Sequence, residues 1–517
     1  MKQLGPLDSA FINLENNTTP QHVGGLGIYD PSTAPNGTVR FKSVLDNFET
    51  RFQAMPIFRT RLVRVPGQID RPYWVVDQNF DVEFHLRHIA LPEPGDWRQL
   101  WIQVARLHSR SLDLSRPLWE AYVIEGLDNL PDIPKGAFAI YTKMHHSLVD
   151  GAGGQGFMTA IHDLEPNPRP SSATAETLIV DRQPSPTELL SRALVNRVKN
   201  TVTLSTGFLK KAREMAEYRR SVKKGEIPSA SIQAPRTRFN EMVGPHRVAD
   251  AAVFSLDDFK AIKNAAGVTL NDVAVSVVGG GLRKYLQYYN ELPETSLAAG
   301  IPMDMHTRRA ATDENNQIAS MVAPIHTDIG DPMARLKAVH ESMNIAKQSN
   351  ATNPMVDSLR IAGVFSPVLS QAVARFYVRN KLSKRLPVSI CGVITNVAGP
   401  NFAMYSAGAK LIRNYGLGLL TPGSGLFHSI YSFDGMVTLT VLGDRDQMPD
   451  PEFYRQCLET AFVETKAAAL GSPQRAAAKP NVRKAKAVVN KKSTTPANKK
   501  RTTTSKRTAG KKAAAKA

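Results

Sequence analysis

The sequence predicts an α/β protein with two ordered regions, a helical connection between them and a disordered basic tail. Its 517 residues leave room for several domains of about 150 residues each. A content of 42% apolar and 21% charged residues is typical of soluble globular proteins. Strand-like and helix-like patterns occur together on both sides of the connection. We expect the four parts to span residues 1–184, 185–245, 246–470 and 471–517.

The first region contains both a strand pattern and a helix pattern. Ala137–Met144 form an apolar run that suits a strand, whereas Trp97–Ser111 have the spacing of a helix. In the connection, apolar side chains recur at helical spacing between Ser185 and Lys224, and Pro186 suits a helix start. We therefore expect one long amphipathic helix, or two. Its basic polar face suits a solvated interdomain helix or a helix at a membrane surface.

The second region shows the same mixture of patterns. Helical spacing occurs in Asn271–Tyr288 and Met333–Ser349, and strand-like runs occur in Val388–Val397 and Met436–Leu442. Both regions are therefore predicted to be α/β.

Basic residues are concentrated in the tail. Of the 65 Lys and Arg residues in the chain, 15 lie between Arg475 and Ala517, where no acidic residue occurs; the remainder has 50 basic against 46 acidic residues. A segment of Lys, Ala, Thr and Pro buries too little apolar surface to fold, so we expect disorder. Its charge suits attachment to an anionic membrane or a lipid-inclusion surface. Non-specific binding of nucleic acid through the tail is the alternative.

Several protein classes do not fit the sequence. Two cysteines, Cys391 and Cys457, do not make a disulfide framework or a cysteine-rich metal site. The best apolar run, Val273–Leu282, includes three glycines and falls short of the roughly 20 apolar residues of a membrane-spanning helix. Met1–Phe11 lack the features of a secretory signal. We expect a cytoplasmic protein that lies peripherally on the inner membrane or on lipid inclusions.

The segment His145–Gly151, with the sequence HHSLVDG, is the strongest candidate for a site of chemistry. Two histidines follow a predicted strand, and Asp150 comes four residues after His146. A neutral imidazole accepts a proton from a hydroxyl or an amine near neutral pH, and such a general base contributes about 10² to 10⁴ in rate. On spacing alone, a chance pair of surface or core histidines is the more common explanation.

Two other interpretations of this segment are weaker. His145, His146 and Asp150 could ligate a metal, but no HExxH motif or cysteine pair accompanies them. Gly151–Gly156 spell the G-x-G-x-x-G pattern of dinucleotide sites, but prolines between Pro166 and Pro170 cut the following helix short. We expect neither a metal nor a cofactor.

HHSLVDG has the HHxxxDG form of the CoA-dependent acyltransferases, and the chain resembles the bacterial wax ester synthase/diacylglycerol acyltransferase family. The opening segment DSAFINLENNTTPQHVGG is also similar to that family. Ala398 stands where the family has the middle proline of its NVPGP element. These elements lie in the expected order between residues 6 and 450. The other matching residues are Pro117, Leu118 and Trp119 (the PLW element), Asn271 and Asp272 (the ND element), and Asn396, Gly399 and Pro400 (the NVAGP segment).

The resemblance implies a fold and an activity. The fold would be two chloramphenicol-acetyltransferase-like α/β domains that form an interdomain tunnel. The activity would be transfer of a fatty acyl group from acyl-CoA to a long-chain alcohol, giving a wax ester, or to diacylglycerol, giving triacylglycerol. Acyl-CoA would be a substrate, so no cofactor is implied.

The resemblance also implies roles for the motif residues. His146 would be the general base and His145 would position it, while Asp150, next to Gly151, would orient the loop through an arginine such as Arg308 or Arg309. Asn271, which precedes Asp272, would either donate a hydrogen bond to the oxyanion or cap a helix. The PLW element would pack in the core or line a channel. The NVAGP segment would be a strand and turn in which Gly399 permits positive φ.

No GxSxG nucleophile turn occurs in the sequence, so transfer without an acyl-enzyme is expected. Two alternatives remain at this point. One is a condensation-type domain that uses the same motif on carrier proteins. The other is a non-catalytic scaffold that binds lipid inclusions or nucleic acid through the basic tail.

Overall fold

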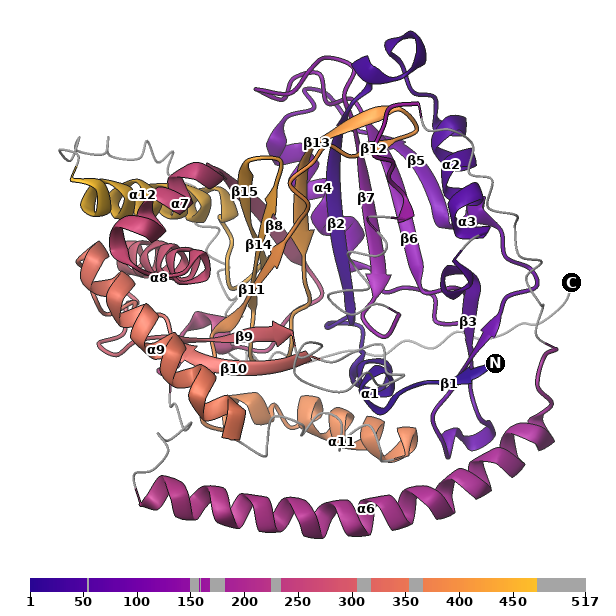
Figure 1. The fold of residues 1–517 in the computed structure, drawn as a ribbon. Coiled ribbons are helices and arrows are strands. Elements are labelled where there is room, and N and C mark those ends of the chain that lie inside the picture. Colours follow the sequence, from indigo (N-terminus) through magenta and orange to yellow (C-terminus); the bar gives the residue numbers. More distant parts are fainter. Residues whose placement is uncertain are drawn as a thin grey trace, which may run out of the picture. The chain divides into compact units, whose positions relative to one another are not determined.

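Two six-stranded sheets form the centre of the fold (Figure 1). The computed structural model describes residues 1–53, 55–148, 158, 160–167, 182–224, 234–304, 318–352 and 366–471. The first sheet contains, in spatial order, β12 (Tyr405–Ser406), β13 (Ala409–Leu417), β2 (His22–Asp30), β7 (Phe138–His145), β6 (Trp119–Glu125) and β5 (Leu86–Ala90). All neighbours in it are antiparallel except β5 and β6.

The second sheet mixes parallel and antiparallel pairs. Its order is β10 (Ile318–Pro324), β9 (Ala298–Asp304), β11 (Gly392–Ala398), β14 (Leu426–Phe433), β15 (Met436–Asp444) and β8 (Arg247–Ser255). The β11 strand runs parallel to both of its neighbours, β9 and β14. A separate antiparallel sheet of three short strands contains β1 (Lys2–Gln3), β4 (Tyr73–Val76) and β3 (Thr60–Val63).

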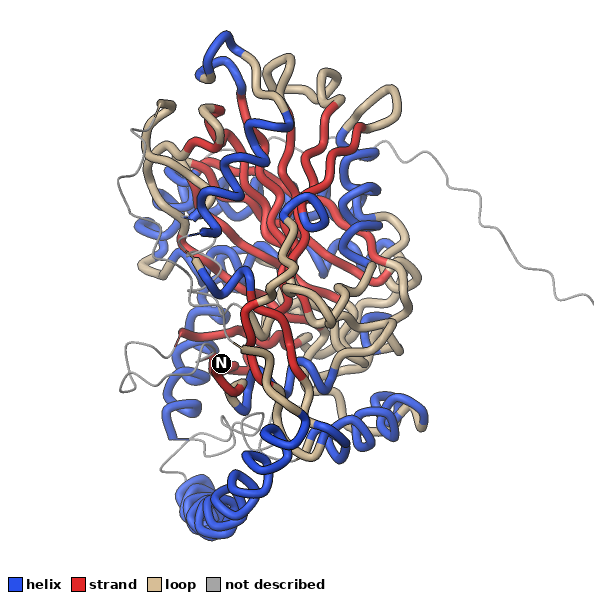
Figure 2. Tube along the Cα trace, turned by 90° about the vertical axis from the view of Figure 1, so that its right-hand side faces the viewer, coloured by secondary structure: helices blue, strands red, loops and turns tan. Residues whose placement is uncertain are grey.

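Helices surround these sheets. They are α1 (Pro6–Leu14), α2 (Phe41–Gln53), α3 (Val82–His85), α4 (Trp97–Ser109), α6 (Pro186–Lys223), α7 (Leu256–Ala266), α8 (Leu270–Tyr288), α9 (Pro332–Thr352), α11 (Pro367–Arg379) and α12 (Pro451–Leu470). Short 3-10 turns include η4 (Pro66–Gln68) and η7 (Leu382–Lys384). Figures 1 and 2 show α6 running along the edge of the fold, away from both six-stranded sheets.

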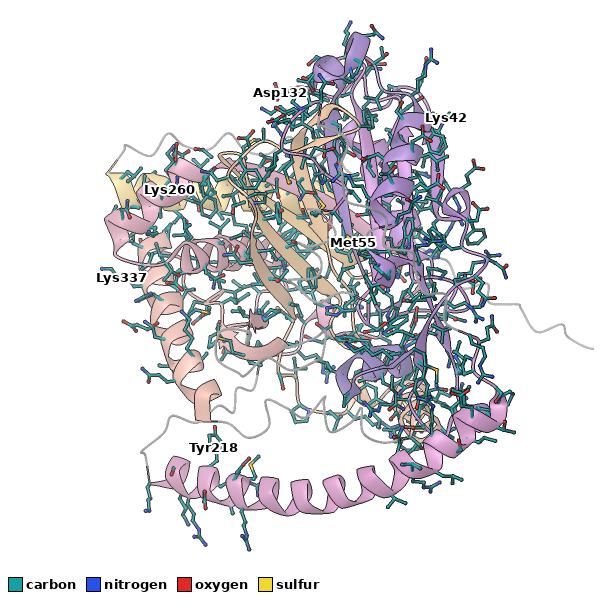
Figure 3. The ribbon with its side chains drawn as sticks, turned by 45° about the vertical axis from the view of Figure 1, so that its right-hand side comes forward. Lys42, Met55, Asp132, Tyr218, Lys260 and Lys337 are labelled. Carbon is teal, nitrogen blue, oxygen red and sulfur yellow. The ribbon has the colours of Figure 1, made fainter. Side chains whose placement is uncertain are left out.

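The helices bury one face and expose the other. A single apolar core joins α7, α8, α9 and α12 to the second sheet. On the outer sides of the covering helices, Lys42 of α2, Lys260 of α7 and Lys337 of α9 are exposed, and Figure 3 shows them at the periphery. A Cβ at Gly279 of α8 would collide with the carbonyl oxygen of Ile325, so glycine lets this helix approach the backbone beside the sheet.

The fold class predicted from the sequence is confirmed, and so are its main elements. The predicted strand Ala137–Met144 is β7, and the predicted strand Val388–Val397 starts later, as β11. The helical connection is one helix of 38 residues, α6. One feature was not foreseen. The β12 and β13 strands come from the C-terminal part of the chain but complete the first sheet beside β2.

The domain boundaries stay a prediction. Residues 1–476 form one compact unit, and the basic tail lies outside the described residues. In the described ranges, no single helix combines the length and apolar character needed to cross a bilayer. The α7 and α8 helices meet both criteria only together, with a bend of 100° between them.

Candidate active site

The histidine pair lies where the central strand β7 ends. All eight residues of this strand are buried, and its last residue, His145, pairs with His22 of β2. The backbone N–H of His145 donates to the carbonyl of Leu118 at 2.9 Å, and that of His146 donates to the carbonyl of Gln21 at 2.8 Å. Backbone hydrogen bonds to the segments on both sides of β7 therefore fix the positions of the two histidines.

The ring of His145 is held through its Nδ1 atom. Nδ1 accepts from the backbone N–H of Ser147 at 3.1 Å and lies 2.7 Å from Oγ of the same residue. Nε2 lies 3.3 Å from Oε2 of Glu15, without a hydrogen bond between the two atoms. His145 is fully buried. These contacts fit a positioning role for His145.

His146 has a different environment from its neighbours. Its side chain is partly exposed, whereas residues 141–145, 147 and 148 are buried. Its ring stacks on Phe11, with ring centroids 4.2 Å apart and an angle of 22° between the planes. Phe11 belongs to α1, and Glu15 caps the C-terminal end of the same helix. One helix therefore contacts both histidines.

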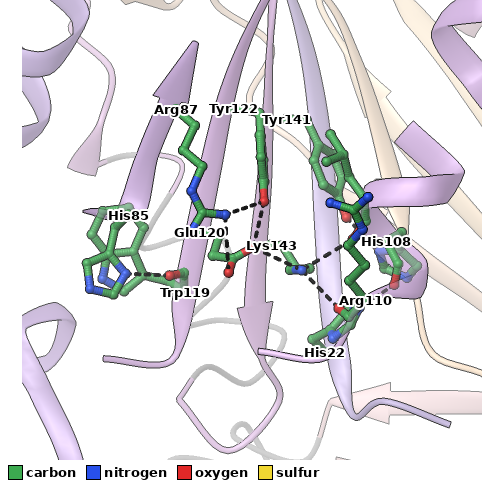
Figure 4. A network of polar contacts seen from close by, with 11 residues as sticks. His22, His85, Arg87, His108, Arg110, Trp119, Glu120, Tyr122, Tyr141 and Lys143 are labelled. Atoms are coloured by element: carbon green, nitrogen blue, oxygen red, sulfur yellow. Dashed lines mark hydrogen bonds and ion pairs between the residues drawn. The ribbon is translucent and has the colours of Figure 1, made fainter. Parts of the chain in front are cut away.

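A polar network surrounds Lys143 of β7, two residues before His145 (Figure 4). Nζ of Lys143 lies 3.1 Å from Oε2 of Glu120 and is fully buried. It also donates to the carbonyls of Leu107 and Arg110, at 3.2 and 2.9 Å. Tyr122 donates to the same carboxylate at 2.8 Å. The buried ammonium group of Lys143 therefore has both a charged partner and hydrogen bonds. A charge needs such partners to offset the cost of its burial.

Two further histidines in this network are neutral. Nε2 of His22 donates to the carbonyl of His108 at 2.7 Å. Burial, together with nearby His108 and Lys143, lowers the pKa of His22 well below 6.5. Burial lowers the pKa of His108 to about 3, and its Nδ1 lies 2.7 Å from the hydroxyl of Tyr141. These two histidines therefore add no positive charge to the network, in which Lys143 and Arg87 both face the carboxylate of Glu120.

The PLW element lies at the start of β6, which pairs with β7 on the side opposite β2. Trp119 pairs in register with Met144 and is fully buried. Its indole N–H donates to the carbonyl of Phe58 at 2.8 Å, and its ring stacks on His85. Leu118, also fully buried, supplies the carbonyl that holds His145. These contacts agree with a packing role for the element.

The ND element begins α8, but Asn271 is not the helix cap. Thr269 is the N-cap: its side chain accepts from the N–H of Asp272, whose carboxylate accepts from the N–H of Thr269 at 2.9 Å. The buried carboxylate of Asp272 also pairs with His340 at 2.7 Å. The amide of Asn271 is engaged elsewhere, because Nδ2 of Asn396 donates to its Oδ1 at 3.3 Å.

The NVAGP segment therefore meets the ND element in space. Asn396 lies within β11, and Gly399 follows the end of that strand. Positive φ was expected at Gly399, but the φ angle there is not positive. The reason for glycine is space: a Cβ would collide with the carbonyl oxygen of Ser432 and lie 2.5 Å from Cζ of Tyr431. Pro400 lies just beyond β11 in the segment that leads to β12.

Part of the expected site lies outside the described residues. This holds for Asp150, Gly151, Arg308 and Arg309. The ion pair expected for Asp150 and the interdomain tunnel stay predictions. In the described part of the chain, no group of three or more His, Cys, Asp or Glu side chains could hold a metal ion.

Comparison with protein families identifies the family of this chain. A sequence model of the wax ester synthase/diacylglycerol acyltransferase catalytic domain matches residues 4–274, and a model of the C-terminal domain of that family matches residues 315–466. The chain belongs to the wax ester synthase/diacylglycerol acyltransferase family. It is therefore an acyltransferase.

Relatives and solved structures agree with this family. A protein of Mycobacterium tuberculosis, provisionally named a diacylglycerol O-acyltransferase, is 32% identical over 471 residues, which are 89% of this chain and 98% of that protein. A relative from Mycobacterium bovis with the same provisional name is 30% identical over 478 residues, covering 90% and 98% of the two chains. The wax ester synthase/diacylglycerol acyltransferase of Marinobacter aquaeolei has 27% identity and a TM-score of 0.65, over 91% of this chain and 100% of that one.

The fold is shared more widely. A trichothecene 15-O-acetyltransferase from Fusarium sporotrichioides, 12% identical, has a TM-score of 0.54 over 90% of this chain and 94% of its own. The first condensation domain of the calcium-dependent antibiotic synthetase, 11% identical, has a TM-score of 0.52 over 90% and 96%. These likenesses show the same α/β fold, as the sequence resemblance implied.

Sequence reasoning missed three residues that build the site. Glu15 and Phe11, which contact the two histidines, lie in the opening segment, whose resemblance to the family was noted without roles for single residues. The buried Lys143 precedes His145 by two positions, so its side chain lies on the same face of β7. A lysine inside an otherwise apolar strand was the available signal.

Proposed function

We propose that this chain transfers a fatty acyl group from acyl-CoA to the hydroxyl of a long-chain alcohol or of diacylglycerol. Membership of the family supports acyl transfer, and its name covers both acceptors. The provisional name of the mycobacterial relatives supports diacylglycerol. The observation that carries the proposal is the contrast between the two histidines, one locked and buried, the other stacked and partly exposed.

In the proposed mechanism, His146 is the general base. Its ring takes the proton of the acceptor hydroxyl while the hydroxyl oxygen attacks the thioester carbonyl. The tetrahedral intermediate then expels the CoA thiolate, to which the same ring returns the proton. Stacking on Phe11 at 4.2 Å supports this role, because it fixes the plane of the ring, and orientation of the base is a large part of its effect.

Asn271 is the proposed donor to the oxyanion of the intermediate. Its Oδ1 accepts from Asn396, which leaves Nδ2 as the end of the amide that can donate to another group. The N-cap role belongs to Thr269, so capping does not explain the asparagine. Removal of one oxyanion donor costs about 10² to 10³ in kcat.

Direct transfer without an acyl-enzyme is supported by the state of the cysteines. Cys391 and Cys457 are both buried. Burial raises the pKa of each thiol to about 12. Since the thiolate is the nucleophile, both cysteines are unreactive near neutral pH.

The test is an acceptor panel with one acyl-CoA. The purified chain is mixed with hexadecanol, with a diglyceride or with a carrier-bound amine, and free thiol and lipid product are measured together. Thiol release matched by ester formation with either of the first two is expected. Transfer to the amine alone would contradict the proposal and favour a condensation-type reaction.

The role of His146 is tested in the same assay. His146→Ala should lower turnover by at least about 10² while the circular dichroism spectrum stays unchanged. His246→Ala is the matched control, because it removes an exposed histidine and should leave turnover unchanged. Near-normal transfer by His146→Ala would remove the proposed base.

A further inference from the structure

The outward face of α11 is apolar. Val368, Leu369, Val373 and Phe376 are 52, 50, 60 and 61% exposed, respectively. Positions 369, 373 and 376 follow the i, i+4, i+7 spacing of one helical stripe, and position 368 lies beside it. Four large apolar side chains are thus presented to solvent by a helix of 13 residues.

The side of α11 that faces the protein is mixed in polarity. The residues less exposed than the stripe are both polar and apolar: Ser370, Gln371, Ala374, Tyr377 and Val378. Nε2 of Gln371 lies 2.9 Å from Oε1 of Gln68 and 3.4 Å from Oδ1 of Asn13, so it donates to both. A helix on a soluble protein usually buries its apolar stripe, whereas α11 exposes the stripe. An apolar face of this kind marks a surface for interaction.

The charged residues of α11 and of the turn after it are all basic. No acidic residue occurs between Asp357 and Asp434 in the sequence. The helix and the turn after it carry Arg375, Arg379, Lys381, Lys384 and Arg385. Lys384 forms an ion pair with Glu241. A row of cations beside an apolar stripe is the pattern of helices that lie in a membrane interface.

We propose that α11 docks the protein on the surface of an anionic phospholipid bilayer. The apolar stripe would enter the boundary between headgroups and acyl chains, and Arg375 and Arg379 would contact lipid phosphates. A second copy of the same face is disfavoured as the occupant, because two basic faces would repel each other. With 13 residues, α11 lies along the interface and does not span it.

The position of α11 next to α1 relates the proposed docking surface to the candidate active site. The helix packs against α1 (Figure 1), and Gln371 ties it to Asn13. The same α1 carries Phe11, which stacks on His146. Docking through α11 would bring a lipid surface next to the helix that holds the candidate base. Membrane binding is measured without acyl transfer, so the inference does not depend on the proposed reaction.

A local fluorescence probe tests the proposal in the full chain. Phe376→Trp places an indole in the stripe, where binding to vesicles of phosphatidylcholine and phosphatidylglycerol should shift its emission to the blue. Adding Arg375→Gln and Arg379→Gln should reduce this shift. Because the chain has four native tryptophans, the emission of the parent protein is recorded under the same conditions, and the difference between the two spectra reports on α11 and not on the basic tail. Unchanged emission on vesicles that bind the chain would overturn the proposal.

Vesicle flotation gives the second measurement. At about 0.5 M salt, charge attraction from the tail is screened, whereas apolar insertion persists. Val373→Ser with Phe376→Ser should lower partitioning at least about tenfold. The matched control is Val463→Ser with Leu470→Ser, which removes two exposed apolar side chains from α12 and should have no effect. Equal partitioning of both double variants would overturn the proposal, as would dissociation of a dimer by the α11 variant without loss of vesicle binding.

Discussion

Asn396 donates a hydrogen bond of 3.3 Å from Nδ2 to Oδ1 of Asn271. The two residues are 125 positions apart in the sequence, and each belongs to a separate motif of the family. The contact joins β11 to the first turn of α8. It also sets the direction of the Asn271 amide, because its oxygen faces Asn396.

The two interpretations of Asn271 lead to different outcomes. Asn271→Ala should lower kcat by about 10² to 10³ with little change in the midpoint of thermal unfolding, because the capping box of α8 stays intact. Thr269→Ala should instead lower the free energy of unfolding by about 1 kcal/mol. Kinetics and thermal unfolding of both variants check this. Loss of stability without loss of kcat in Asn271→Ala would return the residue to a structural role.

Glu15 should matter for stability through His145. Glu15→Ala would remove the carboxylate that lies 3.3 Å from the buried Nε2 of His145, and we expect a loss of about 1 to 3 kcal/mol in the free energy of unfolding. Glu15→Gln keeps an acceptor oxygen near the 3.3 Å contact and should retain most of the stability. Urea unfolding of both variants measures the difference. Equal stability of the two would show that the contact contributes little.

Gly399 should be intolerant of a side chain. Gly399→Ala places a Cβ against the carbonyl of Ser432 and the ring of Tyr431, so we expect a loss of about 1 to 3 kcal/mol. The strain should also move Asn396, three residues earlier, and lower turnover. Asn401→Ala, an exposed substitution in the same segment, is the control. A Gly399→Ala protein as stable as this control would show that the backbone moves freely here.

Acid should destabilise the protein through its buried histidines. Burial lowers the pKa of His108 and His428 to about 3 and that of His162 to about 4. Below about pH 6.5 the unfolded chain binds protons at these sites before the folded chain does, so stability falls as the pH falls. The loss is at most about 1.4 kcal/mol per pH unit for each histidine.

One carboxyl acts in the opposite direction. Burial raises the pKa of Asp250 to about 6, so the folded chain binds that proton first and gains stability as the pH falls from about 6 to 4. Because the three histidines outnumber this carboxyl, we expect a net loss of stability as the pH falls. Urea unfolding from about pH 7 to 4 measures the slope, which His108→Gln should reduce by one proton. An unchanged slope in this variant would contradict a neutral His108.

The sequence was informative wherever a local pattern decides structure. An apolar run predicted β7, and helical spacing predicted α6, α8 and α9, because side-chain periodicity reports directly which face of an element is buried. The boundaries were less accurate. The predicted strand from Val388 starts at Gly392 instead, since pairing with β9 and β14 decides where a strand begins.

The candidate site was predicted unequally. His145 and His146 were found because the motif is contiguous and similar to a known family. The stacking of Phe11 on His146 and the buried pair of Lys143 and Glu120 were not found, since neither leaves a periodic signal. The role of Gly399 was predicted from conformation, but it arises from the close approach of another strand.

The amino-acid sequence by itself determined the α/β class, the main helices and strands, the histidine pair and the family, because these depend on residues close together along the chain or on the order of motifs. Tertiary structure alone decided that β13 completes the first sheet, that Glu15 and Phe11 hold the two histidines, and that α11 exposes its apolar face. Each of these depends on contacts between segments far apart in the chain, and local patterns of residues do not specify such contacts.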